Sequence, residues 1–312
     1  MSTLKTVLIA GAGAVGLTVA DTFYRYDPRC VAVLASGERL ERYRRAGLWI
    51  NGTRVDFTLA GLPGETGTAF DLIIIASKNH HLDHIIADIK PFVGPETIIL
   101  SLLNGITSEE TIGAVYGKKR LPLGMILGTD AQHKDGKTVF VQRGIVHFGD
   151  GESQETERDK KIAEFFTRAG LPFDYHPHDM KRTLWYKFMM NVGANQTSAL
   201  LRLPYSAFKK NHPKAVPEAQ EILESAMREV ILISRAEGLD LGEEDITRWY
   251  TTVALLNDEG YTSMCQDVLA GRKTEVELFG LAIMEYGKKH RIPTPVNELL
   301  YRALRALERG FV

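Results

Sequence analysis

Residues 6–16 read TVLIAGAGAVG, and this stretch decides the fold of the first half of the chain. Its first five residues form an apolar run typical of a buried parallel strand, and a helical pattern follows the glycines. A strand, a glycine-rich loop and a helix in this order make the dinucleotide-binding fingerprint. Gly11 permits the tight turn, Gly13 lets a pyrophosphate approach the backbone, and Gly16 lets helix and strand pack closely. The flanking strand and helix disfavour the alternative, a glycine-rich turn without a ligand.

The second predicted strand, 30–34, bears on the choice between NAD and NADP. An NAD site usually has an Asp or Glu at the end of this strand. This chain continues instead with Ala35-Ser36-Gly37-Glu38-Arg39. Ser36 and Arg39 could hold the 2′-phosphate of NADP, although Glu38 weakens that inference. Alternatively, Arg39 only begins the next helix, whose other arginines face solvent.

The next two predicted strands place polar residues at one edge of a parallel sheet. Strand 71–77 is followed by Lys78, and strand 97–103 is followed by Asn104-Gly105. Open α/β sheets bind ligands beyond the carboxyl ends of their strands, where the glycine loop also lies. Lys78 and Asn104 are therefore candidate cofactor-binding residues, although Asn-Gly is also a common turn dipeptide. The alternation of strands and helices predicts a doubly wound α/β domain.

The region from Leu121 to Gly149 predicts an antiparallel end to this domain. Asp135-Gly136 is a hairpin signal, and we expect strands at 138–141 and 145–148 on either side of Arg143-Gly144. His147 alternates with apolar neighbours, which favours a structural role.

Metal binding is not expected. His80 and His84 stand one helical turn apart, but no cysteine or carboxylate pattern completes a ligand set around them. A solvated helix start beside the cofactor is the better interpretation.

The second half of the chain is helical in pattern. We place the domain boundary near Pro177, with an α/β domain at 1–177 and an all-α domain at 178–312. An edge strand is expected at 173–175, just before the boundary. Helical periodicity covers 159–169, 215–237, 262–290 and 296–309.

Lys187, Asn191 and Asn195 follow one another at four-residue spacing, so a regular helix would present all three on one stripe. Asparagine is a poor residue for helix interiors, and local rules tend to break at functional sites. One ammonium and two amides could hold and protonate an oxygen-rich small molecule. The alternative is a solvated helix face.

Further polar candidates lie in the stretch 262–290. Ser263 and Asp267 are one helical turn apart, and a solvated face is the default interpretation for each. Glu275 and Glu277 cannot share a helix face, and the pattern does not choose between them.

Composition excludes several classes of function. The formal net charge of the 312-residue chain is -1, so there is no general basic field for nucleic acid or anionic lipid. No apolar run approaches membrane-spanning length, and we expect no secretory signal, because the N-terminus runs straight into a strand pattern. Two distant cysteines, Cys30 and Cys265, give no disulfide framework. We expect a cytoplasmic protein.

With these pieces in place, the chain resembles the ketopantoate reductase (2-dehydropantoate 2-reductase) family over nearly its whole length. The resemblance is carried by Gly11-Ala12-Gly13-Ala14-Val15-Gly16, Lys78, Asn104-Gly105, residues 128–149, Lys187 with Asn191 and Asn195, residues 262–267, and Thr274-Glu275. It implies a Rossmann-type NADP domain and a helical domain, with a small-molecule 2-keto acid substrate in the cleft between them.

The resemblance also implies roles for single residues. Lys187 would be the general acid for the keto oxygen, and Glu275 would bind the substrate hydroxyl and orient the site. Substrate oxygens would be held by Asn104, Asn191, Asn195 and Ser263. The cofactor, NADPH, would be held by the glycine loop and Lys78. The implied reaction converts 2-dehydropantoate to pantoate, a step toward pantothenate and coenzyme A.

Two positions depart from the family pattern. Family members often have an arginine directly after the second strand, where this chain has Ala35-Ser36. Many also have an asparagine three residues before the serine matching Ser263, where this chain has Gly260. The alternatives are therefore a reductase of another 2-keto acid or a non-catalytic NADP-binding redox sensor. An opine- or glycerol-phosphate-type dehydrogenase would need its own motifs, which we do not find. The apolar helical half could bury a homodimer face.

Overall fold

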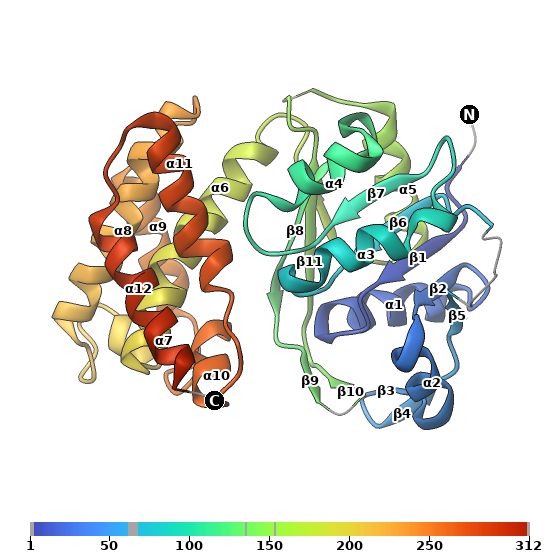
Figure 1. Cartoon of the computed structure of the whole chain (residues 1–312), viewed down its shortest axis with the longest axis horizontal. Helices are drawn as coiled ribbons and strands as arrows, with labels where there is room; N and C mark the ends of the chain where they lie inside the picture. Colours follow the sequence, from blue (N-terminus) through green and yellow to red (C-terminus); the bar gives the residue numbers. More distant parts are fainter. Residues whose placement is uncertain (1–2, 62–67, 135, 153, 311–312) are drawn as a thin grey trace. The chain divides into compact units, whose positions relative to one another are not determined.

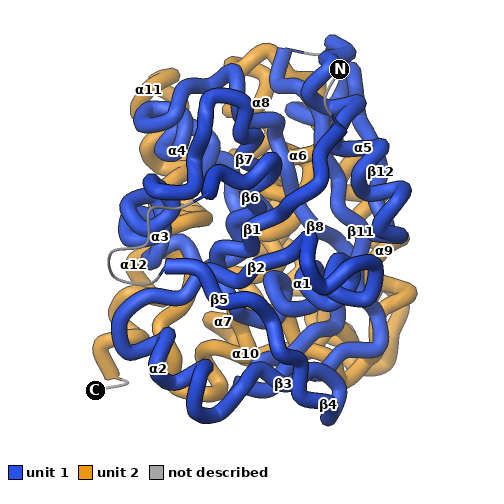
Figure 2. Tube along the Cα trace, turned by 90° about the vertical axis from the view of Figure 1, so that its right-hand side faces the viewer, with its two compact units in different colours: residues 1–181 blue, residues 182–312 orange. Residues whose placement is uncertain are grey.

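The computed structural model describes residues 3–61, 68–134, 136–152 and 154–310. The chain divides into two compact units, Met1–Lys181 and Arg182–Val312 (Figure 2). The first unit is α/β and the second is all-α (Figure 1). No helix among the described residues is long and apolar enough to cross a membrane.

A five-stranded parallel sheet forms the centre of the first unit. Its strand order is β5-β2-β1-β6-β7. The strands are β1 (Val7–Ala10), β2 (Val31–Leu34), β5 (Thr58–Ala60), β6 (Leu72–Ile75) and β7 (Ile98–Ser101). The chain first builds outward from β1 through β2 and then continues on the other side of β1 through β6. This reversal of strand order marks the place where open α/β sheets bind their ligands.

The sheet is buried on both faces because its strands are almost wholly apolar. Val7 and Ile9 of β1 belong to a core that also contains residues of α1 (Ala14–Tyr26) and α5 (Glu157–Ala169). Leu8 and Ala10 point to the opposite core, which contains residues of α3 (Leu82–Asp88) and α4 (Ser108–Tyr116). The period of two along the strand therefore produces the predicted Rossmann-type doubly wound arrangement.

Two smaller sheets complete the first unit, and they correct the expected strand pairing. One has the order β12-β11-β8 and the other β4-β3-β10-β9. Arg143 and Gly144 lie inside β11 rather than between two strands. Gly144 has φ +82°, and a Cβ there would lie 2.8 Å from the Leu127 carbonyl oxygen, so this irregular strand start requires glycine.

The expected hairpin is present around Gly136 (φ +76°), but Asp135 lies outside the described residues. The strand expected at 138–141 is the shorter β10, Lys137–Val139, and it pairs with β9 and β3 instead of β11. The strands of both smaller sheets are β3 (Leu48–Ile50), β4 (Thr53–Val55), β8 (Leu123–Thr129), β9 (Gln132–Lys134), β10 (Lys137–Val139), β11 (Arg143–Gly149) and β12 (Phe173–Tyr175).

Two of the helices of the second unit contain π-helical turns. The α-helices are α6 (Met180–Met190, which begins in the first unit), α7 (Gln196–Leu201), α8 (Pro217–Ala236), α9 (Glu243–Ala254), α10 (Ser263–Leu269), α11 (Ala282–His290) and α12 (Pro295–Arg309). The π-helical segments are η4 (Asn191–Asn195), between α6 and α7, and η6 (Glu277–Leu281), before α11.

The remaining helical elements are α2 (Gly37–Ala46), η1 (Asn79–His81), η2 (Lys90–Phe92) and η3 (Lys118–Arg120) in the first unit and η5 (Tyr205–Phe208) in the second.

The continuous helix expected at 262–290 is wrong. Helix α10 ends at Leu269, and Gly271 follows with φ +62°, a conformation that ends helices. The guanidinium of Arg272 then bonds back to Asp267 at 2.8 Å. Helical structure resumes only at η6, so Ser263 lies on α10 and Glu275 lies in the non-helical segment before η6.

A buried polar network ties three helices of the second unit together. Glu229 of α8 accepts hydrogen bonds from the backbone amides of Val296 (2.8 Å) and Asn297 (3.0 Å) at the start of α12. The Asn297 amide donates to Glu229 (2.7 Å), and its oxygen accepts from Gln196 of α7 (2.9 Å). Gln196 also donates to the Val192 carbonyl within η4 at 2.8 Å. The network therefore fixes η4 and α7 against α8 and α12.

We predict that Glu229→Gln lowers the free energy of unfolding by about 1–3 kcal/mol. The neutral amide loses the charge assistance of three hydrogen bonds and turns N–H groups toward backbone donors. Urea unfolding measures the effect, with Glu221→Gln on the exposed face of α8 as the matched control. Equal midpoints for the two variants would show that the network contributes nothing to stability.

Candidate active site

The glycine loop of the first unit has the geometry that a dinucleotide pyrophosphate needs. Gly11 has φ +125°, and a Cβ there would lie 2.5 Å from the Ala76 carbonyl oxygen. A Cβ at Gly16 would lie 1.8 Å from the Gly11 carbonyl oxygen. Gly13, in contrast, has no heavy atom within 4 Å of its Cβ position, and no side chain caps the α1 N-terminus there. The first helical amides therefore face open space and can receive an anion.

Lys78 and Asn104 lie beyond the same edge of the sheet as this loop. Strands β1, β6 and β7 are neighbours, with Ala10, Ile75 and Ser101 in register at their carboxyl ends. Lys78 and Asn104 follow the ends of β6 and β7 within a few residues. The shared edge predicted from the sequence is therefore present in the fold.

Ser36 and Arg39 differ in their surroundings. Ser36 lies at the start of α2, and its hydroxyl donates to Asp88 at 2.7 Å. Arg39 lies close enough to His81 for its positive charge to affect the pKa of that histidine. The pKa of His81 is lowered, first by burial and then by the charges of His80, Arg39, His84 and Lys78. Positive groups thus gather on this rim, whereas the Ser36 hydroxyl is already engaged.

Lys187 is a buried cation in the second unit. It lies in the last turn of α6 and is only 7 % exposed. Burial lowers its pKa to about 8, and the Glu275 carboxylate opposes that shift. A lysine with a pKa near neutrality can donate a proton and be reprotonated at physiological pH.

The asparagines beyond Lys187 lie on η4 rather than on a regular α-helix. The segment therefore departs from one regular α-helix, and a shared face for the three residues stays a prediction. A Cβ at Gly193 would lie 2.6 Å from the side chain of Met227, a residue of α8. The side of η4 on which Gly193 lies therefore packs against α8. Asn191 and Asn195 lie two positions to either side of Gly193 in the sequence. Asn195 is 7 % exposed, and π-helical turns are frequent at functional sites.

The structure distinguishes the two glutamates that the sequence left open. Glu277 forms ion pairs with Lys273 and Arg305, both at 3.3 Å. Glu275 is half-buried, and its charge acts on Lys187. Glu275 is thus the carboxylate associated with the buried ammonium.

The α10 region explains one departure from the family pattern. Ser263 is the exposed first residue of α10, and Thr262 caps the helix by accepting the Cys265 amide at 3.2 Å. A Cβ at Gly260 would lie 3.0 Å from the Tyr205 ring, and the Gly260 carbonyl accepts the Tyr205 amide at 2.8 Å. An asparagine at 260 would require the ring to move.

Sequence reasoning missed Gln196 and Asp88. Gln196 supports η4, and Asp88 engages the hydroxyl proposed for the cofactor phosphate. Neither residue carries a motif, and both matter only through partners distant in sequence.

Comparison of the sequence with profiles of known protein families identifies the family to which the chain belongs. The profile described as "Ketopantoate reductase PanE/ApbA" matches residues 7–153, and "Ketopantoate reductase PanE/ApbA C terminal" matches residues 179–308. The chain is 28% identical over 306 residues to 2-dehydropantoate 2-reductase of Pyrococcus horikoshii, with 97% of each chain covered.

Solved structures share the fold. A D-mandelate dehydrogenase with NADH and anilino(oxo)acetate superposes with a TM-score of 0.85 at 23% identity, covering 98% of this chain and 99% of the other. A dimeric ketopantoate reductase from Staphylococcus aureus gives 0.80 at 22% identity, covering 98% and 100%. At these identities the likeness shows the fold alone. The two profile matches together span most of the chain, which belongs to the ketopantoate reductase family of oxidoreductases that act on 2-keto acids with a nicotinamide cofactor.

Proposed function

We propose that this protein reduces 2-dehydropantoate to pantoate with NADPH, with Lys187 as the general acid. The observation that carries the proposal is the buried ammonium of Lys187, with a pKa of about 8, beside the Glu275 carboxylate. Burying a lysine is costly, and strongly shifted pKa values cluster at functional sites. In this proposal residues 1–177 bind the cofactor and residues 178–312 supply the acid.

The residue types suit the reduction of a ketone. The bound cofactor supplies a hydride to the carbonyl carbon, and negative charge develops on the oxygen. Lys187 stabilises that charge and delivers the proton from Nζ to the same oxygen. Glu275 keeps the lysine protonated against the effect of burial, because its charge raises the pKa of Lys187.

Substrate recognition is assigned to amides and a hydroxyl. Asn191 and Asn195 bind the polar oxygens near Lys187, and Asn104 is assigned to substrate binding on the evidence of its place after β7 alone. Ser263 binds the carboxylate, since it is exposed at the N-terminus of α10. A hydroxylated 2-keto acid has carboxylate, ketone and hydroxyl oxygens, which suits a set of amide and hydroxyl partners.

The cofactor proposal favours NADP over NAD. Gly11, Ala12, Gly13, Ala14, Val15 and Gly16 hold the pyrophosphate, and Lys78 and Asn104 lie on the adjoining rim. The clustered positive groups around His81 suit a 2′-phosphate. Because Ser36 donates to Asp88, we assign the main phosphate contact to Arg39.

A second candidate is a reductase of a different 2-keto acid, using NADH. Two observations favour it: Gly260 replaces an asparagine of the family pattern, and Asp88 places a carboxylate beside Ser36. A D-mandelate dehydrogenase with NADH has the same fold. A redox sensor without turnover is less well supported, because it has no need of a buried proton donor. We also propose a homodimer, as in the dimeric relative.

A substrate panel tests the proposal directly. NADPH or NADH oxidation is followed with 2-dehydropantoate and with aromatic and aliphatic 2-keto acids. The highest kcat/KM is expected for 2-dehydropantoate with NADPH. A higher kcat/KM for another 2-keto acid would identify that acid as the substrate and leave the reaction class unchanged. NADPH binding without any turnover would favour the redox sensor.

We predict that Lys187→Ala lowers kcat by about 10²–10⁴-fold with little change in NADPH affinity. Only the protonated amine can donate, so wild-type kcat should also fall as pH rises through about 8. Steady-state rates and fluorescence titration with NADPH measure the two effects. Lys288→Ala, an exposed lysine of α11, is the control. Retention of wild-type turnover by Lys187→Ala would remove this residue from the mechanism.

Arg39→Ala should raise KM for NADPH about 10-fold or more and leave KM for NADH nearly unchanged. The reason is the loss of one charge-assisted contact to the 2′-phosphate. Arg42→Ala, an exposed residue of the same helix, should change neither constant. Equal effects on the two cofactors would place Arg39 outside the 2′-phosphate site.

The buried ammonium also predicts a pH-dependent stability. The pKa of Lys187 is about 8 in the folded state and 10.5 in the reference state. Between these values the unfolded chain binds more protons, so stability rises with pH, and by about 3 kcal/mol in total. Below pH 8 both states are protonated and the slope vanishes.

The comparison variant for this effect is Lys187→Met. Urea unfolding of both proteins from pH 7 to pH 10.5 should show the wild type gaining stability relative to the variant. Parallel curves over the whole range would mean that Lys187 titrates normally.

A further inference from the structure

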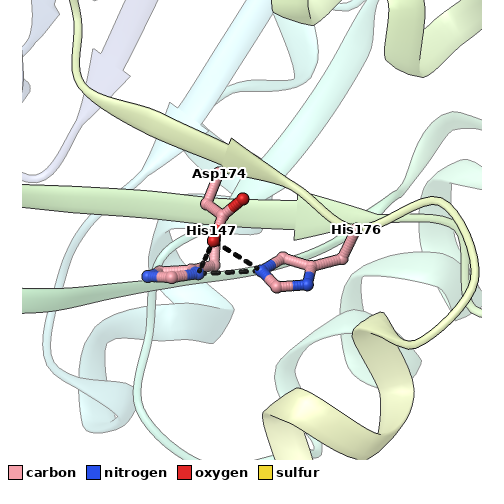
Figure 3. A group of neighbouring side chains, drawn as sticks. All are labelled: His147, Asp174 and His176. Carbon is pink, nitrogen blue, oxygen red and sulfur yellow. Dashed lines mark hydrogen bonds and ion pairs between the residues drawn. The ribbon is translucent and has the colours of Figure 1, made fainter.

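The structure assigns a divalent transition-metal site to His147, Asp174 and His176 of the first unit, with Zn²⁺ as the ion that fits best. These residues belong to the sheet formed by β12, β11 and β8, whereas the glycine loop follows β1 of the parallel sheet. Figure 3 shows the two imidazole rings and the carboxylate converging on one point.

Strand register brings the three side chains together. His147 of β11 is the direct partner of Asp174 in the parallel strand β12. His176 lies two residues after Asp174, and its amide continues the ladder by donating to the Phe148 carbonyl at 2.8 Å. Since side chains alternate along a strand, Asp174 and His176 share the face on which His147 lies.

The distances fit a tetrahedral ion. His147 Nδ1 lies 2.9 Å from His176 Nε2, and Asp174 Oδ2 lies 3.6 Å and 3.4 Å from these two nitrogens. Zinc bonds of about 2.0–2.1 Å at tetrahedral angles place ligand atoms about 3.3 Å apart. The three donor atoms therefore already lie close to the corners of one tetrahedral face.

A fourth residue, Asp179, orients one of the two imidazole rings, as carboxylates that contact histidine ligands do in zinc proteins. His176 Nδ1 lies 3.1 Å from Asp179 Oδ1. That contact fixes the hydrogen on Nδ1 and leaves the lone pair of Nε2 directed at the cluster. The ion would replace the hydrogen between the two ring nitrogens, with His147 in its Nε2–H form.

Burial and charge agree with metal binding. The side chains of His147 and His176 are 14 % and 16 % exposed, so both donors are held in place. Asp174 is 59 % exposed, which leaves an entry path and a position for water as the fourth ligand. The carboxylate balances part of the ion's charge. A hydrogen bond between the two rings would account for the contact of His147 with His176. It would not account for the positions of Asp174 and Asp179 beside them.

The location suggests what the ion would do. Helix α6 begins at Met180, directly after Asp179, and Lys187 lies on that helix. Binding would clamp β11 to the segment that leads into α6. The ion would stabilise the end of the first unit and take no part in hydride transfer.

The test is titration of the full-length, metal-stripped protein with Zn²⁺ by calorimetry. One equivalent per chain is expected. Asp174→Asn and His176→Gln should lower the affinity by more than about 10-fold, and Asp179→Asn by about 10–100-fold. Co²⁺ substitution should give the visible absorption of a tetrahedral centre in the wild type and not in Asp174→Asn.

Matched controls separate this site from other histidines. His178→Gln, two residues beyond His176, and His84→Gln, on α3, should bind Zn²⁺ as the wild type does. Circular dichroism confirms that each variant folds. Absence of saturable binding in the wild type, unchanged binding in Asp174→Asn and His176→Gln, or loss of binding in His84→Gln would each overturn the assignment.

Discussion

The helical unit depends on a carboxylate and two amides inside an apolar core. Glu229, Asn297 and Gln196 are linked by hydrogen bonds that also satisfy the first backbone amides of α12, and among the described residues only the Gln196 side-chain oxygen of this set is buried without a partner. Removing any one would expose the others to the full cost of desolvation. The directional hydrogen bonds of the network fit the observed arrangement of α7, α8 and α12, and sliding or rotating one helix would break them.

That arrangement determines where the reactive groups stand. Gln196 donates to the Val192 carbonyl, a group inside the π-helical segment η4, and so supports a turn that a regular helix would not adopt. Gly193 lets the same segment pack closely on α8, because a side chain there would collide with Met227. Lys187 lies only one turn before η4, where burial lowers the pKa of its ammonium. Structural polar groups thus hold in place the cation on which the proposed chemistry relies.

The sequence predicted the parts of the fold that local rules control. The strand, glycine loop and first helix followed from residues 6–16, because the loop geometry requires glycine whatever the rest of the chain does. The hairpin between β3 and β4 was missed although its signal is present. Asn51 and Gly52 both have positive φ, as the two-residue turn of such a hairpin requires. The candidate site was predicted as residue types in a pattern, which is why Glu275 and Glu277 could not be separated.

What the sequence could not supply was any relation set by distant partners. The π-helical segment η4 breaks the 3.6-residue period, and the contacts of Gln196 and Gly193 that support it come from other helices, so a periodicity analysis of residues 187–195 does not reveal it. The same limit applies to His147. Its alternation with apolar residues correctly indicates a strand, but its partners His176 and Asp174 become neighbours only through the register of β11 and β12. A metal-ligand set spread over two strands has no fixed spacing, unlike one built within a single helix. Its recognition therefore requires the pairing of the sheet, and with that pairing the geometry of the three donors can be measured directly.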